Sequence, residues 1–463
     1  GGGGVKGVKV DQAKELKERL YGARLVGATC LTAGSSKLLR SHVRFDVCVV
    51  DEAGQVSQPN VLGPLFLSKA FVLVGDDNQL QPLVRSKEAE SMGMSVSLFQ
   101  RLSSASASES SSRAALAELK IQYRMNRDIM RLSNRLVYQQ VGCQMRCGNE
   151  QIALAKLKLP RYPAALPSFT PPRAVPACSS SSLPAAAMIA TRQATGQWLV
   201  DALDPNNSVV FLDTDALDPN RKYFEERRSF AMSSASQSSS APLASDSNNE
   251  DGDDGAMVEE KNKGAVVNEV EAKLVVGIAV CLLRCGLDPA ELGITSPYRK
   301  QLELIRAELK ERLLDPTLDV VSVTEEGQKK SGSSSSSSNH RAASAAAQLA
   351  KIEVTTIDKY QGRDKACMLV STVHSNATGE VGTLLDDKRR VNVLLSRAKH
   401  KLLFVGSAST LSTAVRCAKK KNLASSSTKQ SQEPPIAAEL MKFLHQNKWV
   451  HKLPTGTHTA GGF

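Results

Sequence analysis

Short apolar segments recur along the chain, and most of them are followed by a polar turn. They occupy residues 24–31, 45–52, 71–77, 208–214, 292–298, 367–373 and 401–407. Segments of this length are too short for most helices and are typical of buried strands. Because the hydrophobicity is continuous rather than alternating, the pattern predicts strands covered on both faces, as in a parallel sheet.

Helical patterns lie between several of these strands. Residues 268–285 begin with Asn268, carry Glu271 at the third helical position and stop at Gly286, which predicts a capped helix. Residues 298–313 and 388–399 are predicted to be helical as well. Alternation of strands and helices predicts a doubly wound α/β fold.

Low-complexity segments interrupt the ordered pattern. Residues 229–264 and 325–350 are rich in Ser and Ala, and 140–196 contain many prolines with little periodicity. Such composition buries too little apolar surface to offset the entropy lost on ordering. We therefore expect insertions near these three ranges.

The charge balance points to a polyanionic partner. The 463 residues include 59 Lys and Arg against 47 Asp and Glu, a net charge of +12, which favours nucleic acid. No apolar run is long enough to cross a membrane, and the first residues do not resemble a signal peptide. The nine scattered cysteines have no paired zinc spacing and indicate reduced thiols.

Acidic turns follow two consecutive strands. Asp51 and Glu52 end the strand VCVVDE, and GDDNQ, ending at Gln79, closes the next one. The carboxyl ends of parallel strands are where α/β sheets bind ligands. In nucleotide motors one acid holds Mg²⁺ and another group orients the attacking water. The alternative is a capping role for the acids and an ordinary Gly-Asp turn.

Two arginines are candidates for contact with a phosphate. Arg124 lies in QYRM, and Arg397 in RRVNVLLSRAKH is the stronger candidate for an arginine finger. In the latter helix we expect an apolar face toward a core and a polar face away from it. The apolar face holds Val391, Val393 and Leu394, and the other faces hold Asn392, Ser396, Arg397 and Lys399. The alternatives are a solvated arginine and a basic surface helix.

The order of the motifs is more specific than any one of them. DEAGQ, GDxxQ, QYRM, SPYRKQ, TIDKYQGRD and RRVNVLLSRAKHK follow one another along the chain. This order resembles motifs II to VI of superfamily 1 helicases, in the branch that includes the nonsense-mediated decay helicase. Stretches such as MGMSVSLFQRL narrow the resemblance to the helicase part of eukaryotic helicase/nucleases of DNA replication.

The resemblance implies tandem RecA-like lobes of the P-loop NTPase type, with parallel sheets. The first lobe would occupy 20–118 and the second 119–455, with 1–19 as a remnant or linker and 456–463 as a tail.

The resemblance also implies a role for each motif residue. Asp51 would bind Mg²⁺, Glu52 would activate water and Gln79 would contact the γ-phosphate. Arg124 and Arg397 would reach that phosphate from the second lobe. Tyr123 would pack near the base, and Gly362 and Asp364 would touch phosphate and ribose.

No GxxxxGK[ST] motif occurs in the sequence. That loop supplies the backbone cradle and the Lys for the β- and γ-phosphates. We therefore expect a first lobe truncated at its N-terminus and no ATPase activity from this chain alone. The resemblance places a nuclease domain with an iron–sulfur cluster further upstream, outside this sequence.

The function that the resemblance implies is ATP-dependent 5′-to-3′ DNA unwinding in replication and repair. ATP and Mg²⁺ would be the cofactors, with single-stranded DNA, flaps and DNA ends as substrates and a single-strand-binding protein as a partner. The expected compartment is the nucleus, with the mitochondrion as a second one. Two alternatives stay open, namely an RNA helicase of the decay branch and a degenerate module that binds nucleic acid without hydrolysis.

Overall fold

The computed structural model forms two units, Gly1–Leu119 and Lys120–Phe463. The structure describes residues 18–35, 43–108, 116–166, 197–217, 266–315, 346–414 except 361 and 377, and 434–454, with 15 and 38 in addition. The predicted insertion at 229–264 and most of that at 325–350 lie outside these residues. None of the described helices is long and apolar enough to cross a membrane.

The first unit contains a two-stranded parallel sheet. Strands β1 (Phe45–Val50) and β2 (Ser68–Leu73) are joined through η1 (Ala53–Gln55) and α4 (Gln58–Leu65). Helices α2 (Cys30–Ala33), α5 (Lys87–Ser91) and α6 (Leu98–Ser108) belong to this unit as well. Val49 and Phe71 are 64% and 48% exposed. The expectation that these strands are covered on both faces is therefore wrong in this unit, where the described sheet has too few strands to be enclosed.

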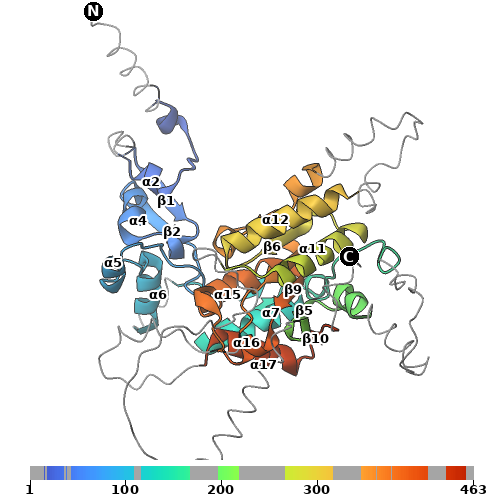
Figure 1. Ribbon diagram of the computed structural model, residues 1–463. Coiled ribbons are helices and arrows are strands. Elements are labelled where there is room, and N and C mark those ends of the chain that lie inside the picture. The colour runs from blue at the N-terminus through green and yellow to red at the C-terminus, as the bar shows by residue number, and fades with distance from the viewer. Residues whose placement is uncertain are drawn as a thin grey trace, which may run out of the picture. The chain divides into compact units, whose positions relative to one another are not determined.

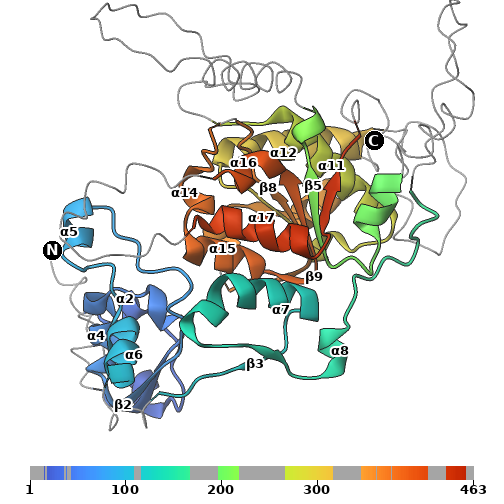
Figure 2. The same cartoon turned by 90° about the horizontal axis from the view of Figure 1, so that it is seen from below.

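The second unit is built on six parallel strands in the order β10-β5-β9-β8-β6-β7. Figure 2 shows β5, β9 and β8 of this sheet side by side. Their bounds are β5 Val209–Asp213, β6 Leu292–Thr295, β7 Glu353–Thr355, β8 Lys365–Ser371, β9 Ala398–Gly406 and β10 Val450–Lys452. Strand β5 is buried along its whole length, and so is β8 after Lys365. Here the continuous apolar pattern correctly predicted a parallel sheet covered on both faces.

Helices cover both faces of this sheet (Figure 1). One face carries α11 (Glu269–Arg284) and α12 (Arg299–Leu314), and the other carries α7 (Arg127–Ser133), α15 (Lys388–Leu395) and α17 (Ile436–Gln446). Shorter elements connect these helices and strands. These are β3 Ile121–Gln122, η3 Asn134–Tyr138, η4 Gln139–Val141, β4 Arg146–Cys147, α8 Glu150–Ala153, η5 Asp215–Leu217, η6 Pro289–Glu291, η8 Ile357–Tyr360, α14 Gly382–Leu385 and α16 Ala408–Ser412.

Helix α11 shows how the sequence sets a boundary. The side chain of Asn268 accepts a hydrogen bond from the backbone N–H of Glu271, as the predicted cap requires. Gly286 follows the helix with φ of 93°, a conformation that glycine adopts at little cost. Because most of its residues are buried, α11 lies in the core rather than on the surface.

Three predictions about local structure are wrong. Residues 24–31 form no strand, because Thr29 caps the short helix α2 and divides the apolar run. The predicted helix 388–399 ends at Leu395, and Ala398 already begins β9. Within the predicted insertion at 140–196, the described residues 140–166 pack with the rest of the unit, since Leu157 and Leu159 join the main core.

Candidate nucleotide-binding site

The two acidic turns of the first unit lie side by side because β1 and β2 are parallel and in register. Val50 pairs with Leu73, and the N–H of Ala53 donates to the carbonyl of Val74 at 2.8 Å. A Cβ on Gly75 would lie 2.9 Å from the backbone nitrogen of Gly54. Only a residue without a side chain at position 75 lets the two turns approach this closely.

Asp51 and Glu52 leave the sheet through a sharp turn. Glu52 has φ of 52°, the left-handed region that a residue with a side chain rarely adopts. Its N–H donates to Asp51 Oδ1 at 2.9 Å, and its own Oε2 accepts from Gln55 Nε2 at 2.8 Å. Both carboxylates are exposed at the end of the strand. Backbone strain of this kind concentrates at functional sites.

Gln79 is held over the second turn. Its Nε2 donates to Asp76 Oδ2 at 3.0 Å, and Asp76 Oδ1 accepts from the N–H of Asn78 at 2.9 Å. No group of three or more acidic, His or Cys side chains is placed to hold a metal among the described residues. Mg²⁺ bound beside a nucleotide needs only one or two carboxylates, since phosphates and water complete its shell. Asp51 therefore fits that requirement without a preformed metal cage.

A charged cluster in the second unit joins three segments that are distant in the sequence. Arg124 Nε lies 3.2 Å from Asp364 Oδ2, and Lys399 Nζ lies 2.9 Å from Asp364 Oδ1. Gln122 fixes the QYRM turn, because its Oε1 accepts from the N–H groups of Arg124 and Met125. The side chain of Arg124 is 40% exposed, so its guanidinium remains accessible to a phosphate.

Lys399 was not singled out as a site residue by the sequence, although it shares a carboxylate with Arg124. The helical interpretation of 388–399 placed Lys399 on a polar face of that helix. As the second residue of β9 it lies next to the loop that contains Asp364. Recognition that the helix stops at Leu395 would have revealed this position.

Arg397 is not on a polar surface. It is 2% exposed, its Nε donates to the carbonyl of Val393 at 3.0 Å, and Nη1 donates to the carbonyl of Arg363 at 3.2 Å. Asn392 and Ser396 are buried as well, so the expected polar faces of this segment are wrong. The reason is that the segment packs against the sheet and η8, and buried polar groups find carbonyl and hydroxyl partners there. In this conformation Arg397 ties α15 to the loop after η8.

The other two residues assigned to the nucleotide lie on turns. Tyr123 is 63% exposed, and its ring lies against Gly148, where a Cβ would come within 2.1 Å of the ring. Gly362 has φ of 73° with no neighbouring atom near its missing side chain. An exposed aromatic ring and an open glycine turn are both able to face a ligand.

A buried carboxylate that the sequence did not single out supports the loop after β8. Glu271 is fully buried, and its Oε2 accepts from Ser371 Oγ at 2.6 Å and from the N–H of Val373 at 2.9 Å. Burial raises the pKa of Glu271 to about 7. Val373 has φ of 72°, so this carboxylate holds a strained turn, whose next residue His374 contacts Tyr298 of SPYRKQ.

Comparison with known proteins identifies the family of this chain. Family models described as AAA domain match residues 6–87 and 94–409. The second match alone covers more than half of the chain, and the chain therefore belongs to this AAA-domain helicase family, within superfamily 1.

The relatives narrow the resemblance to one kind of helicase. The DNA replication ATP-dependent helicase/nuclease of Bos taurus is 33% identical over 446 residues, which are 96% of this chain and 30% of the relative. The Homo sapiens protein of the same name is 34% identical over 446 residues, again 96% and 30%. That of Schizosaccharomyces pombe is 31% identical over 449 residues, 97% and 23%. The chain spans less than a third of these relatives and resembles their helicase region.

Proposed function

We propose that this chain is the motor part of an ATP-dependent DNA helicase that translocates 5′ to 3′ and acts on flaps and DNA ends in replication and repair. The observation that carries the proposal is the placement of the motifs on the fold. Asp51, Glu52 and Gln79 follow adjacent parallel strands, and Arg124, Asp364 and Lys399 meet in one cluster. The relatives, which are named as DNA replication helicase/nucleases, support the choice of DNA.

Each residue has a defined task in this proposal. The Asp51 carboxylate would hold Mg²⁺, which neutralises charge on the phosphates when bound. Glu52 accepts a proton from the attacking water, and Gln79 orients that water or a phosphate oxygen through its amide. Arg124 stabilises negative charge on the transferring phosphoryl group, and Tyr123 and Gly362 face the nucleotide.

Arg397 reaches the phosphate only if it leaves its buried carbonyl partners, so its role depends on a rearrangement of α15.

DNA and RNA binding are compared first on the purified chain. Fluorescence anisotropy with labelled single strands of equal length, one of deoxythymidine and one of uridine, gives the affinity for each across a range of salt. We expect tighter binding to DNA, and steep weakening with salt because phosphate contacts release counterions. Tighter binding to RNA would favour the decay-branch alternative, and equal affinity for both would remove the case for a DNA-specific motor.

Hydrolysis is tested by adding a P-loop, whose motif this sequence does not contain. In a chimaera that places the P-loop segment of a superfamily 1 helicase before residue 20, DNA should stimulate phosphate release. Glu52→Gln should abolish release yet keep ATP binding, because the amide has the shape of the acid but cannot accept the proton. Unwinding of a duplex with a 5′ tail, and not of one with a 3′ tail, is the expected polarity. A chimaera that binds ATP and DNA but never hydrolyses would support the degenerate module instead.

A further inference from the structure

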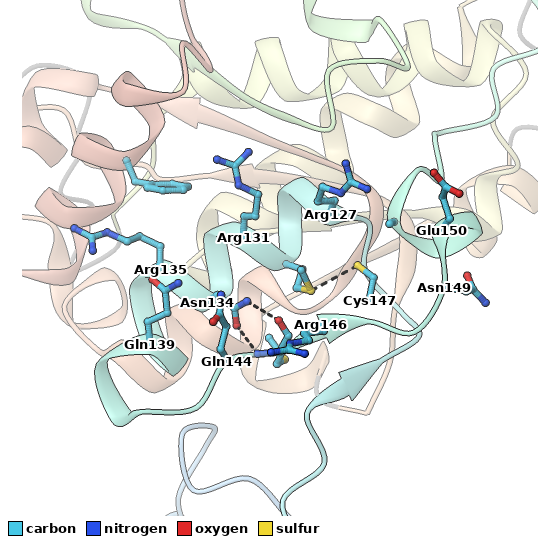
Figure 3. Close-up of a pocket in the computed structure, with 14 residues that line it drawn as sticks. Arg127, Arg131, Asn134, Arg135, Gln139, Gln144, Arg146, Cys147, Asn149 and Glu150 are labelled. Atoms are coloured by element: carbon cyan, nitrogen blue, oxygen red, sulfur yellow. Dashed lines mark hydrogen bonds between the residues drawn. The ribbon is translucent and has the colours of Figure 1, made fainter.

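A cavity of about 680 Å³ opens on the second unit, outside the motif loops. It lies between α7, η3, the segment 144–150 and α17 (Figure 3). Its polar lining includes Arg127, Arg131, Arg135, Arg146, Asn134 and Glu150. None of its lining residues belongs to the segments assigned to the nucleotide.

Four arginines give the cavity a strong positive character. Arg127, Arg131 and Arg135 recur every four residues along α7 and η3, and Arg146 lies on the neighbouring strand β4. Four residues of α-helix rise about 6 Å, a step comparable with that between neighbouring phosphates of an extended single strand. All four arginines are exposed, so their guanidinium groups are available to solvent ligands.

Acidic neighbours neutralise only part of this charge. Arg131 lies 3.7 Å from Asp128, and Arg135 lies 4.0 Å from Glu439. For Arg127 and Arg146 no ion pair is found within the described residues. Exposed ion pairs of this kind contribute little, and a phosphate can displace them.

Buried hydrogen bonds join two walls of the cavity. Asn134 is 3% exposed, its Nδ2 donates to the carbonyl of Met145 at 2.9 Å, and its Oδ1 accepts from the N–H of Met145 at 3.0 Å. These two bonds fix the strand that carries Arg146 against the helix. Residues Asn134–Tyr138 form a π-helical turn, a feature often found at functional sites.

We propose that this cavity, hereafter the arginine pocket, binds the phosphate backbone of single-stranded DNA at a place separate from the motor motifs. The proposal rests on the proposed DNA-dependent function and adds a second contact to it. Phe443 lines the pocket beside Trp449 and is partly exposed, so a base can stack where the backbone meets the arginines. An aromatic platform beside a positive groove favours nucleic acid over an acidic peptide.

The test compares two triple variants of the full chain. The first is Arg127→Ala, Arg131→Ala and Arg146→Ala, which leaves the buried Asn134 in place. The matched control is Lys273→Ala, Lys300→Ala and Lys310→Ala, which removes the same charge from exposed positions on α11 and α12, across the sheet. A third variant replaces the three arginines by Lys and keeps the charge. Binding of a labelled deoxythymidine strand is measured between low and moderate salt, and circular dichroism checks the fold.

Loss of three phosphate contacts should weaken binding roughly tenfold or more. The negative slope of the logarithm of the association constant against the logarithm of salt concentration should become less steep by about 2. The control should match the parent chain, and the Lys variant should recover most of the slope. Equal slopes for the alanine variant and the control would overturn the arginine pocket while leaving DNA binding intact. A parent chain without affinity for DNA would overturn this inference and the proposed function together. Binding of a phosphorylated acidic peptide at the three arginines, with no change in DNA binding, would assign the pocket to protein instead.

Discussion

The buried carboxylate of Glu271 makes the stability of the second unit depend on pH. In the folded chain its pKa is about 7, because burial disfavours the charged form more than the bonds from Ser371 and Val373 favour it. In the unfolded chain the same group has its ordinary pKa of 4.5. Between these two values the folded form holds a proton that the unfolded form has lost. Stability from this group is therefore complete below pH 4.5 and is lost as pH rises toward 7.

The size of the effect follows from the two pKa values. Each pKa unit corresponds to about 1.4 kcal/mol, so the whole change is about 3 kcal/mol. Glu271→Gln keeps the shape and stays neutral, and it should remove this slope. Asn268 Nδ2 lies 3.4 Å from Glu271 Oε1, where the variant places an amide donor if its own oxygen keeps the bonds from Ser371 and Val373. Any cost of that contact is the same at every pH.

Denaturant unfolding followed by tryptophan fluorescence measures this directly. The chain has two tryptophans, Trp198 and Trp449, and both lie in the second unit, so the signal reports that unit alone. The free energy of unfolding of the parent chain, relative to Glu271→Gln, should fall by about 3 kcal/mol between pH 4.5 and 7.5 and then stay level. Parallel curves for the two proteins across that range would show that Glu271 does not titrate in the folded state as described.

Three further outcomes are expected. Arg397→Ala should lower the free energy of unfolding by about 3 kcal/mol, because charged hydrogen bonds to buried carbonyls are lost. Arg390→Ala removes only a partly exposed ion pair and should lower it by less than about 1 kcal/mol. Gly75→Ala should destabilise the first unit by about 1–3 kcal/mol, seen as faster amide exchange in β1, because the new methyl meets Gly54. The purified chain should release no more phosphate with single-stranded DNA than its Glu52→Gln variant, because it has no P-loop sequence.

Each of these has a clear opposing result. Equal costs for Arg397 and Arg390 would mean that the buried bonds of Arg397 contribute nothing. Gly22→Ala, where no atom lies within 4 Å of the added group, is the control for Gly75, and equal exchange in the two variants would contradict close approach of the turns. DNA-stimulated release absent from Glu52→Gln would show that another segment performs the P-loop's task.

Sequence patterns predicted the four inner strands of the second sheet, which are covered on both faces, but not its short edge strands β7 and β10. Continuous apolar runs then coincide with strands, as in β5 and β8. The same rule failed at 24–31, where a single capping residue, Thr29, turned an apolar run into a helix start. Periodicity alone does not separate these outcomes, since both bury a short apolar segment.

For the candidate site, residue types were easier to predict than their surroundings. The family resemblance assigned both Arg124 and Asp364 to contacts with the nucleotide, and their side chains lie 3.2 Å apart. The sequence did not indicate that the side chain of Arg397 is buried, because an arginine among polar residues usually lies in solvent. Lys399 was missed for a related reason, since the predicted helix ran to residue 399, whereas the helix ends at Leu395 and Lys399 belongs to strand β9.

The strand order of the second sheet has a consequence for how the protein is made. Strand β5 lies between β9 and β10, which are about 190 and 240 residues later in the chain. During synthesis β5 leaves the ribosome long before β9 and β10 have been made, so its apolar residues stay exposed without a neighbouring strand. Contacts between such distant segments form slowly, because a long loop must close first. Nascent chains of this protein should therefore depend on chaperones until the residues of β9 have emerged.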